Sequence, residues 1–237
     1  MIPKKIHYCW FGRGEKSKLA IRCIESWKKY CPDYEIIEWN EDNYDVNKNE
    51  YTSWCYRNKK WAFLSDYVRL DVVNEYGGIY FDTDVELIKP LDDLVKYDAF
   101  YGLEKNDTVA TGLGFGSMSN HIIVSDMKKE YEELHIKDDF VPIGCPLLNT
   151  KVILKYCSNL NEKKQNVCGA EILPVDYLNP YDDPTGRLNK TKNTISIHWY
   201  SKSALNKRQI LRSKLTRPFH RLFGEGCFNK LKIYLKR

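Results

Sequence analysis

Residues 74–91 read NEYGGIYFDTDVELIKPL, and this stretch contains both a change of secondary structure and a closely spaced pair of acids. A helical pattern over residues 51–76 is stopped at Gly77–Gly78, a common way for a helix to end. The run IYFDTDVEL that follows predicts a strand, which places Asp82 and Asp84 at a strand end inside an α/β sheet. Ligands of such sheets bind beside the carboxyl ends of the strands.

The segments around this stretch predict a single α/β domain. KIHYCWF (5–11) and YEIIEW (34–39) are expected to be strands, and the helix between them is capped by Ser17 and ended by Pro32. A β-α-β opening favours a parallel sheet. Further strands are expected in DAFYGLE, VATGLGFGS and ISIHWYS, and further helices over 121–134 and 147–157. A chain of 237 residues can bury one sizeable core.

The charge of the chain is unevenly distributed. From residue 205 onward there are ten Lys or Arg residues and one acid, Glu225, whereas the whole chain has a net charge of only +5. Phe228, Leu231 and Leu235 share one helical face among the basic residues, which is typical of a helix that lies on an anionic bilayer. The alternative is a C-terminal helix docked on the core. A basic stripe also attracts nucleic acid, but no recognition motif accompanies it, so no nucleic-acid partner is expected.

Two further features of the composition bear on the compartment. No apolar run approaches the roughly 18 residues of a membrane span, and the N-terminal segment is too short and too polar for a signal peptide. The eight cysteines include no C-x-x-C pair, so most are expected to be reduced core residues. We therefore expect a cytoplasmic protein.

The acids at positions 82 and 84 suit a hard metal ion. On an extended chain two side chains that are two positions apart point to the same face, and Mg²⁺ or Mn²⁺ prefers carboxylate oxygens. The alternative is an ordinary polar turn after a strand. Upstream, Ser65, Asp66 and Arg69 lie on one side of the expected helix. They form either a surface ion pair or a group that hydrogen-bonds a polyhydroxylated ligand.

The run KWAFLSDYVRLDVVNEYGGIYFDTDVELIKPLDDL (60–94) resembles the sugar-binding, D-x-D region of glycosyltransferase family 32. The motifs A-F-x-S-D-x-x-R, G-G-I-Y and D-x-D-V occur in order and at the family's spacing. IPKKIHYCWFG (2–12) and TISIHWYSKSAL (194–205) are similar to its first strand and its C-terminal segment. The resemblance implies a Rossmann-like nucleotide-sugar-binding domain of the GT-A type over residues 1–203, followed by a basic amphipathic helical tail over 204–237.

The resemblance also implies roles for individual residues. It makes Asp82, Asp84 and His198 ligands of Mn²⁺ or Mg²⁺, and Asp66 and Arg69, with Ser65, the grip on the donor sugar. Asp66, Arg69, Asp82 and Asp84 are accordingly the expected catalytic residues. The remaining expected donor contacts are Trp10 at the nucleotide base, Tyr80 at the diphosphate or ribose, and Ser201, Ser203 or Trp199 on the phosphate side. Gly144 is expected to have a weak role near the acceptor. Glu104 and Asp183 are candidates for a carboxylate that stabilises the transition state.

By resemblance the activity is a metal-dependent, retaining transfer of a hexose from a nucleotide sugar, expected to be UDP-linked. The expected acceptor is a lipid-linked oligosaccharide in the synthesis of capsule or another surface polysaccharide, on the inner face of the plasma membrane. Two alternatives stay open: a non-catalytic nucleotide-sugar-binding partner subunit, and the same transfer to a protein acceptor. A phosphohydrolase with FDTDV as its nucleophile motif fits poorly, since Glu86 occupies the motif's last position.

Overall fold

A mixed eight-stranded sheet forms the centre of the molecule in the computed structural model, which describes residues 1–105, 107–137, 139–201, 207–224 and 227–228. Seven of the strands follow the order β2-β1-β3-β7-β5-β9-β8, and β6 pairs with β5 at the side. The strands are β1 (Lys5–Cys9), β2 (Glu35–Trp39), β3 (Gly78–Tyr80), β5 (Ala99–Lys105), β6 (Thr108–Val109), β7 (Phe115–Ser117), β8 (Gln165–Val167) and β9 (Ala170–Leu173).

The direction of the strands corrects the expectation of a parallel sheet. β1 runs parallel to β2 and β3, and β5 runs parallel to β9, whereas β7 is antiparallel to both of its neighbours and β8 is antiparallel to β9. The β-α-β opening thus predicts only the first half of the sheet. In the second half, short connections join β5 to β7 and β8 to β9, and short connections allow antiparallel pairing.

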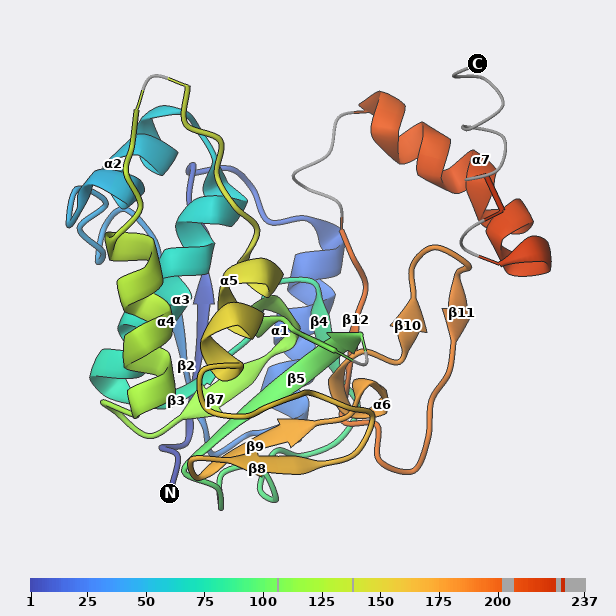
Figure 1. Ribbon diagram of the computed structural model, residues 1–237, viewed down its shortest axis with the longest axis horizontal. Coiled ribbons are helices and arrows are strands. Elements are labelled where there is room, and N and C mark those ends of the chain that lie inside the picture. Colours follow the sequence, from blue (N-terminus) through green and yellow to red (C-terminus); the bar gives the residue numbers. More distant parts are fainter. Residues whose placement is uncertain (106, 138, 202–206, 225–226, 229–237) are drawn as a thin grey trace.

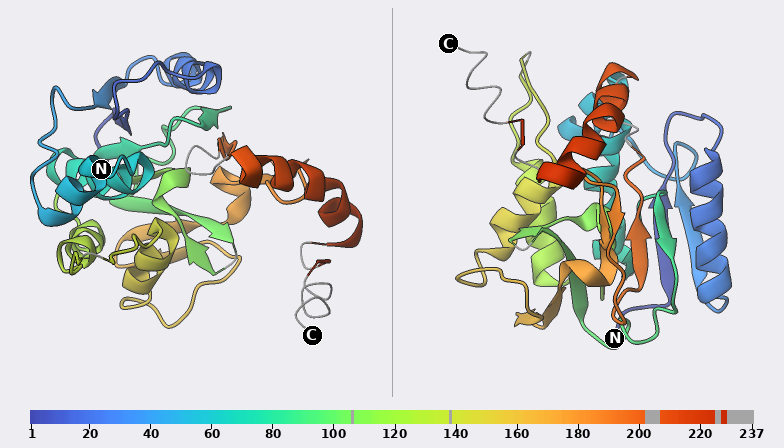
Figure 2. Two further views of the ribbon diagram at one scale, coloured as in Figure 1. Left: turned by 90° about the horizontal axis from the view of Figure 1, so that it is seen from above. Right: turned by 90° about the vertical axis from the view of Figure 1, so that its right-hand side faces the viewer.

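Helices cover both faces of this sheet (Figures 1 and 2). α1 (Lys18–Tyr30) lies on one face, and α3 (Trp61–Tyr76), α4 (Ile122–Glu132) and α5 (Cys145–Ile153) lie on the other, with α2 (Glu50–Arg57) beside α3. Because side chains alternate along a strand, Ile79 of β3 joins the core under α1 and its neighbour Tyr80 joins the core under α3. The two cores are therefore separated by the sheet itself.

The first helix follows its sequence signals. The Ser17 side chain accepts a hydrogen bond from the Ala20 N–H at 3.1 Å, and the helix ends at Tyr30, before Pro32. Trp27 is fully buried, and its indole N–H donates to the Val85 carbonyl at 2.8 Å. That bond fixes α1 to the strand that follows the acid pair.

The longer expected elements are interrupted in the structure. Residues 51–76 form two helices instead of one, because Lys59 between them adopts a left-handed backbone conformation with a φ of 54°. The expected strand over 79–87 is β3 followed by β4 (Val85–Leu87), with a turn between them, and β4 pairs with β12 (Ser196–His198) outside the main sheet. VATGLGFGS divides into β6, a 3-10 turn (Thr111–Leu113) and β7.

The C-terminal part forms the right-hand side of Figure 1. It comprises α6 (Val175–Leu178), β10 (Tyr181–Asp182), β11 (Arg187–Leu188) and α7 (Lys207–Phe223). α7 extends away from the sheet and touches the β10–β11 hairpin, where Arg217 pairs with Asp183 at 2.9 Å. The predicted domain boundary at 203/204 and the predicted apolar positions Leu231 and Leu235 lie outside the described residues.

None of the helices in the described part of the chain combines the length and the apolar character that crossing a bilayer requires.

Candidate active site

The acid pair lies in a turn that links the main sheet to the small β4–β12 ladder. The Phe81 N–H donates to the His7 carbonyl at 3.1 Å, and the Val85 N–H donates to the Asp82 carbonyl at 3.0 Å. Asp82 and Asp84 therefore converge because the chain turns, and the strand alternation expected from the sequence is not the cause. The turn lies beside the carboxyl ends of β1 and β3, where an α/β sheet binds its ligands.

His198 reaches the acid pair through the pairing of β12 with β4. In that ladder His198 lies opposite Val85, the residue that follows the second acid. One ligand atom each from Asp82, Asp84 and His198 lie within 4.8 Å of one another. His198, which is more than a hundred positions from the two acids in the chain, is thus their neighbour in space.

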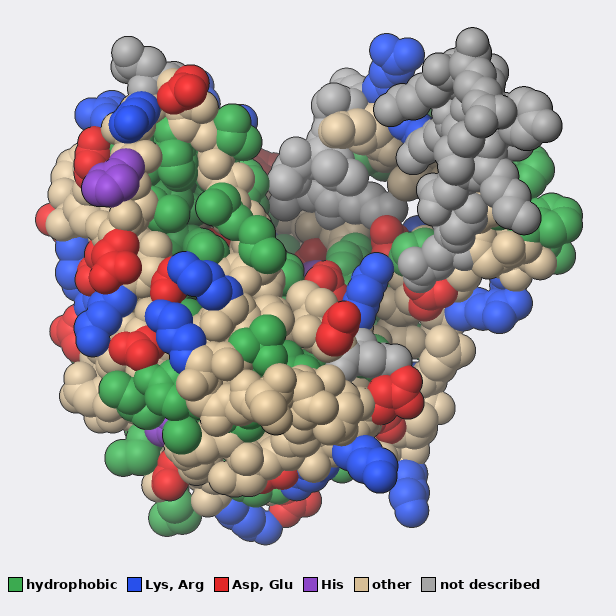
Figure 3. Space-filling view, viewed as in Figure 1, with side chains coloured by type: hydrophobic (Ala, Val, Ile, Leu, Met, Phe, Trp, Pro, Cys, Tyr) green, Lys and Arg blue, Asp and Glu red, His purple; other side chains and the backbone are tan. Residues whose placement is uncertain are grey.

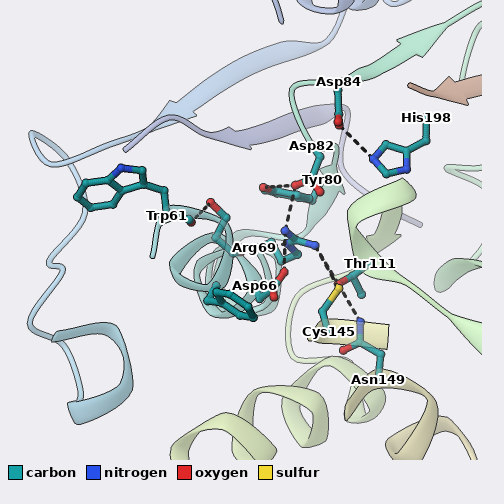
Figure 4. Close-up of polar contacts among 12 residues, drawn as sticks. Trp61, Asp66, Arg69, Tyr80, Asp82, Asp84, Thr111, Cys145, Asn149 and His198 are labelled. Atoms are coloured by element: carbon teal, nitrogen blue, oxygen red, sulfur yellow. Dashed lines mark hydrogen bonds and ion pairs between the residues drawn. The ribbon is translucent and has the colours of Figure 1, made fainter. Parts of the chain in front are cut away.

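Asp84 is held as a carboxylate. Its Oδ1 is 3.1 Å from His198 Nε2 (Figure 4), and its Oδ2 accepts a hydrogen bond from the Ser201 N–H at 2.6 Å. Burial alone would raise the pKa of this group, but the imidazole and the Ser201 N–H outweigh it and lower the pKa well below its usual range. Asp84 therefore carries a full negative charge at neutral pH, and the backbone N–H of Ser201 stabilises that charge.

Asp82 is oriented from the other side of the cleft. Its Oδ1 accepts hydrogen bonds from the Tyr80 hydroxyl and from Arg69 Nη2, both at 3.0 Å (Figure 4). Burial raises the pKa of Asp82, and the nearby Asp84 charge raises it further, while the Arg69 charge opposes both effects. The two acids thus have unlike environments.

Arg69 joins α3 to the acid turn. Its side chain is 3% exposed, and its Nη2 contacts Asp66 Oδ1 at 2.9 Å as well as Asp82. The Nε–H donates to the Ser65 carbonyl at 3.0 Å, and the guanidinium lies over the Tyr80 ring, 4.9 Å from its centroid. Burial raises the pKa of Asp66 to about 6, although the Arg69 charge lowers it. The guanidinium is therefore a buried link between two carboxylates.

These groups line one cleft of about 430 Å³, a size typical of small-molecule sites. The structure brings together in it every residue predicted as catalytic, donor-binding or metal-binding: Trp10, Ser65, Asp66, Arg69, Tyr80, Asp82, Asp84, His198 and Ser201. Of the weaker candidates, Glu104 also lines this cleft. Asp183, Gly144 and Trp199 do not, and Ser203 lies outside the described residues.

Sequence reasoning missed several residues of this cleft, among them Trp61, Gly112 and Cys145. A Cβ at position 112 would lie 2.5 Å from Asp82 Oδ2, so glycine is needed for the close approach. The glycine-rich run TGLGFG could have indicated this approach, but its apolar residues suggested a strand. Cys145 Sγ lies 3.7 Å from Arg69 Nη1, a contact across 76 positions that no local pattern predicts.

Comparison with known proteins identifies the region that contains the acid turn of this cleft. Residues 17–101 match a family model described as "Glycosyltransferase sugar-binding region containing DXD motif". The chain carries a DXD sugar-binding region. This confirms the resemblance to glycosyltransferase family 32, and the matched range contains α3 and the acid turn.

Curated proteins are similar to parts of this chain. An inositol phosphoceramide mannosyltransferase 3 of Schizosaccharomyces pombe is 31% identical over 107 residues, which are 42% of this chain and 29% of that protein. A human alpha-1,4-N-acetylglucosaminyltransferase is 25% identical over 155 residues, 65% of this chain and 40% of that protein. The chain thus matches less than half of the length of either relative.

Among solved structures, one titled "PaToxG Glycosyltransferase" superposes with a TM-score of 0.50 at 19% identity, over 66% of this chain and 70% of that one. At that identity the likeness concerns the fold alone. The fold around the DXD region is the GT-A type, a Rossmann-like α/β sheet with helices on both faces, as the resemblance implied.

Proposed function

We propose that the protein is a metal-dependent, retaining glycosyltransferase that moves a hexose from a nucleotide sugar, UDP-linked by preference, to a lipid-linked oligosaccharide of a capsule or another surface polysaccharide. The observation that carries the proposal is the convergence of Asp82, Asp84 and His198 in a cleft of the DXD region. Curated proteins that match part of this chain are named as a mannosyltransferase and an N-acetylglucosaminyltransferase, which supports the proposal.

The residues present fit a divalent cation. Two carboxylates and an imidazole form the donor set, and His198 Nδ1 is buried without a hydrogen-bond partner among the described residues. A bound Mn²⁺ or Mg²⁺ would act as a Lewis acid on the leaving diphosphate, where negative charge develops as the anomeric C–O bond breaks. Asp84, which is fully charged, and Asp82, which is oriented by Arg69 and Tyr80, would hold it.

Other groups of the cleft would orient the donor. Asp66 lies beside Arg69 and can accept hydrogen bonds from sugar hydroxyls. Trp10 lies at the cleft wall with its indole N–H bonded to the Gly14 carbonyl at 2.7 Å, so its ring is fixed as a flat surface for a base. Ser201 donates its N–H to Asp84 and lines the cleft, so this residue would lie on the phosphate side.

A panel of nucleotides provides the first test. We expect UDP with Mn²⁺ to raise the melting temperature of the protein more than UDP, GDP or CDP alone, because a ligand that binds only the folded state stabilises it by about 2.7 kcal/mol at a concentration of 100 Kd. Differential scanning fluorimetry measures the shift. A melting temperature that rises with GDP but not with UDP would overturn the choice of base. Equal shifts in melting temperature with and without Mn²⁺ would contradict the metal dependence.

Turnover distinguishes the proposed enzyme from a non-catalytic binding subunit. An enzyme releases free nucleotide from the donor slowly even without an acceptor, whereas a binding subunit leaves the donor intact. A radioactive donor distinguishes the two possible acceptors, since label enters either a protein or a lipid-linked glycan.

α7 supports the proposed membrane partner. Leu211, Leu215, Phe219 and Leu222 are all more than half exposed and recur at helical spacing along one side of α7. Hydrophobic and basic side chains occupy the outer edge of this segment in the space-filling view (Figure 3). We propose that this face lies on the anionic inner leaflet of the plasma membrane, where a lipid-linked acceptor is available.

Flotation with vesicles tests this proposal. We expect the protein to float with phosphatidylglycerol vesicles and to be released by 0.5 M salt, since charge attraction is screened. The double variant Leu215→Glu/Phe219→Glu should lose flotation. The control Ile21→Glu/Ile122→Glu makes the same charge change at two exposed apolar positions of the body. Equal flotation of both variants would remove the membrane role of α7.

A further inference from the structure

A second cavity of about 690 Å³ lies beside the proposed donor cleft. Its wall is formed by α6, the β10–β11 hairpin and the chain that follows β12. Glu104, at the end of β5, lines both this cavity and the donor cleft. Glu104 therefore belongs to the boundary between the two cavities.

Tyr200 connects the two cavities as well. Its ring centroid is 4.1 Å from that of His198, and its hydroxyl accepts a hydrogen bond from Asn179 Nδ2 at 2.8 Å. The same hydroxyl lies 3.4 Å from Glu104 Oε1. Tyr200 has a φ of 50°, a conformation that costs energy for a bulky residue and that often marks functional sites. The surroundings thus hold this ring between the metal-binding residues and the second cavity.

Asn179 adds an independent sign of a ligand. The residue is 6% exposed and lines the cavity, and its Oδ1 has no hydrogen-bond partner among the described residues. Its Nδ2 is fully used by the Glu104 carbonyl and the Tyr200 hydroxyl. A buried amide oxygen without a donor is costly, and this unsatisfied acceptor belongs to a residue of the cavity wall.

The lining selects a class of ligand. Tyr181 and Pro180 provide flat apolar surface, and four carboxylates with one lysine provide the charge: Glu104, Asp176, Asp182, Asp183 and Lys105. Carboxylates accept hydrogen bonds from hydroxyl groups, but they repel phosphates and other acids. Arg217 pairs with Asp183 at the rim and reduces the negative charge without reversing it. The chemistry suits an uncharged, polyhydroxylated ligand with an apolar face.

We propose that this second cavity is the acceptor subsite and that it takes an uncharged pyranose unit, so that the terminal sugar of the acceptor is a neutral hexose. The proposal rests on the proposed glycosyltransferase function. Glu104 and Tyr200 form the boundary across which the acceptor hydroxyl faces the donor sugar, while Asn179 and the acids of the hairpin hold the remaining hydroxyls.

Saturation-transfer NMR on the full chain tests the subsite. The probes are the methyl α- and β-glucosides, galactosides and mannosides, with glucose 6-phosphate as an anionic counterpart. At least one neutral hexoside should bind, its signals should persist in excess UDP and Mg²⁺, and glucose 6-phosphate should bind at least about tenfold more weakly. Equal binding of glucose 6-phosphate, or the absence of binding by every hexoside, would overturn the proposal.

A matched pair of variants locates the binding. Asn189 is exposed at the cavity wall, so Asn189→Trp fills the cavity from its mouth without disturbing the interior. Lys190→Trp adds the same ring at the next, exposed position, which does not line the cavity. We expect Asn189→Trp to weaken hexoside binding at least about tenfold and Lys190→Trp to leave it unchanged. Equal affinities in the two variants would place the hexoside elsewhere and refute the subsite.

Nucleotide release without acceptor separates this inference from the proposed function. If both tryptophan variants release nucleotide from the donor like the parent while only Asn189→Trp loses hexoside binding, both proposals hold. Nucleotide release with no hexoside bound in the cavity refutes the subsite alone. Hexoside binding in the cavity by a protein that never releases nucleotide refutes the transferase function alone.

Discussion

Asp84→Asn is expected to reduce nucleotide release from the preferred donor by about 10³-fold, because a metal ion on the diphosphate contributes several kcal/mol to the barrier and each 1.36 kcal/mol is a factor of ten. The substitution removes the carboxylate that is fully charged in the cleft and leaves His198 without its acidic partner. Coupled nucleotide-release assays at saturating Mn²⁺ measure the loss. Circular dichroism at the assay temperature checks that the variant is folded.

Glu86→Gln is the matched control for this prediction. Glu86 is the next acid along the same segment, but its carboxylate bonds the Trp199 indole N–H at 2.7 Å and does not line the donor cleft. A glutamine oxygen can accept the same bond, so activity should stay within about twofold of the parent. If Asp84→Asn, or the double variant Asp82→Asn/Asp84→Asn, turns over as fast as the parent, the metal-binding role of the turn is wrong.

Arg69→Met is expected to lower the free energy of unfolding by about 3–5 kcal/mol, because removing one partner of a buried ion pair leaves uncompensated charge behind. Here two carboxylates, Asp66 and Asp82, would lose the same guanidinium. Urea denaturation followed by fluorescence measures the change. Arg22→Met is the control: Arg22 is half exposed and pairs with Glu86 at the surface, so its loss should cost less than about 1 kcal/mol.

The loss of folding stability in Arg69→Met should also depend on pH. Burial raises the pKa of Asp66 to about 6 in the parent, above the value of about 4 in an unfolded chain. A carboxyl group with a raised folded pKa takes up protons on folding, so its contribution to stability falls as the pH rises through that interval. The variant should therefore be less destabilised at pH 5 than at pH 8, and Asp66→Asn should restore part of the stability at pH 8. An unfolding midpoint equal to that of the parent at pH 8 would contradict the buried link.

The elements that the sequence predicts well are those with local causes. α1 has a serine cap, an apolar face that includes Cys23 and Trp27, and a proline after its end, and it forms where these signals place it. The longer patterns failed where one residue interrupts them. Lys59 breaks the expected helix by its backbone conformation, and a hydrophobic pattern contains no information about φ.

The candidate site divides in the same way. Residue spacing and the family resemblance predict which residues line the donor cleft, since the motifs occur in the family's order and at its spacing along the chain. The cause of their convergence is different from the one inferred from the sequence. A turn joins two sheets at Asp82 and Asp84, and the β4–β12 ladder brings in His198. Cys145 and Gly112 approach the same point from segments whose own sequence shows no chemistry.

The sequence alone determined which acids, which arginine and which histidine this protein has available for binding a metal and a sugar nucleotide, because those residues lie in motifs that can be recognised locally. Tertiary structure decided how the pKa of each acid is shifted: burial raises the pKa of Asp66 and Asp82, while contact with His198 and the Ser201 N–H lowers that of Asp84. It also decided that a second, acidic cavity shares Glu104 with the first. Desolvation and the distances between charges depend on packing across the whole chain, which a local pattern does not specify.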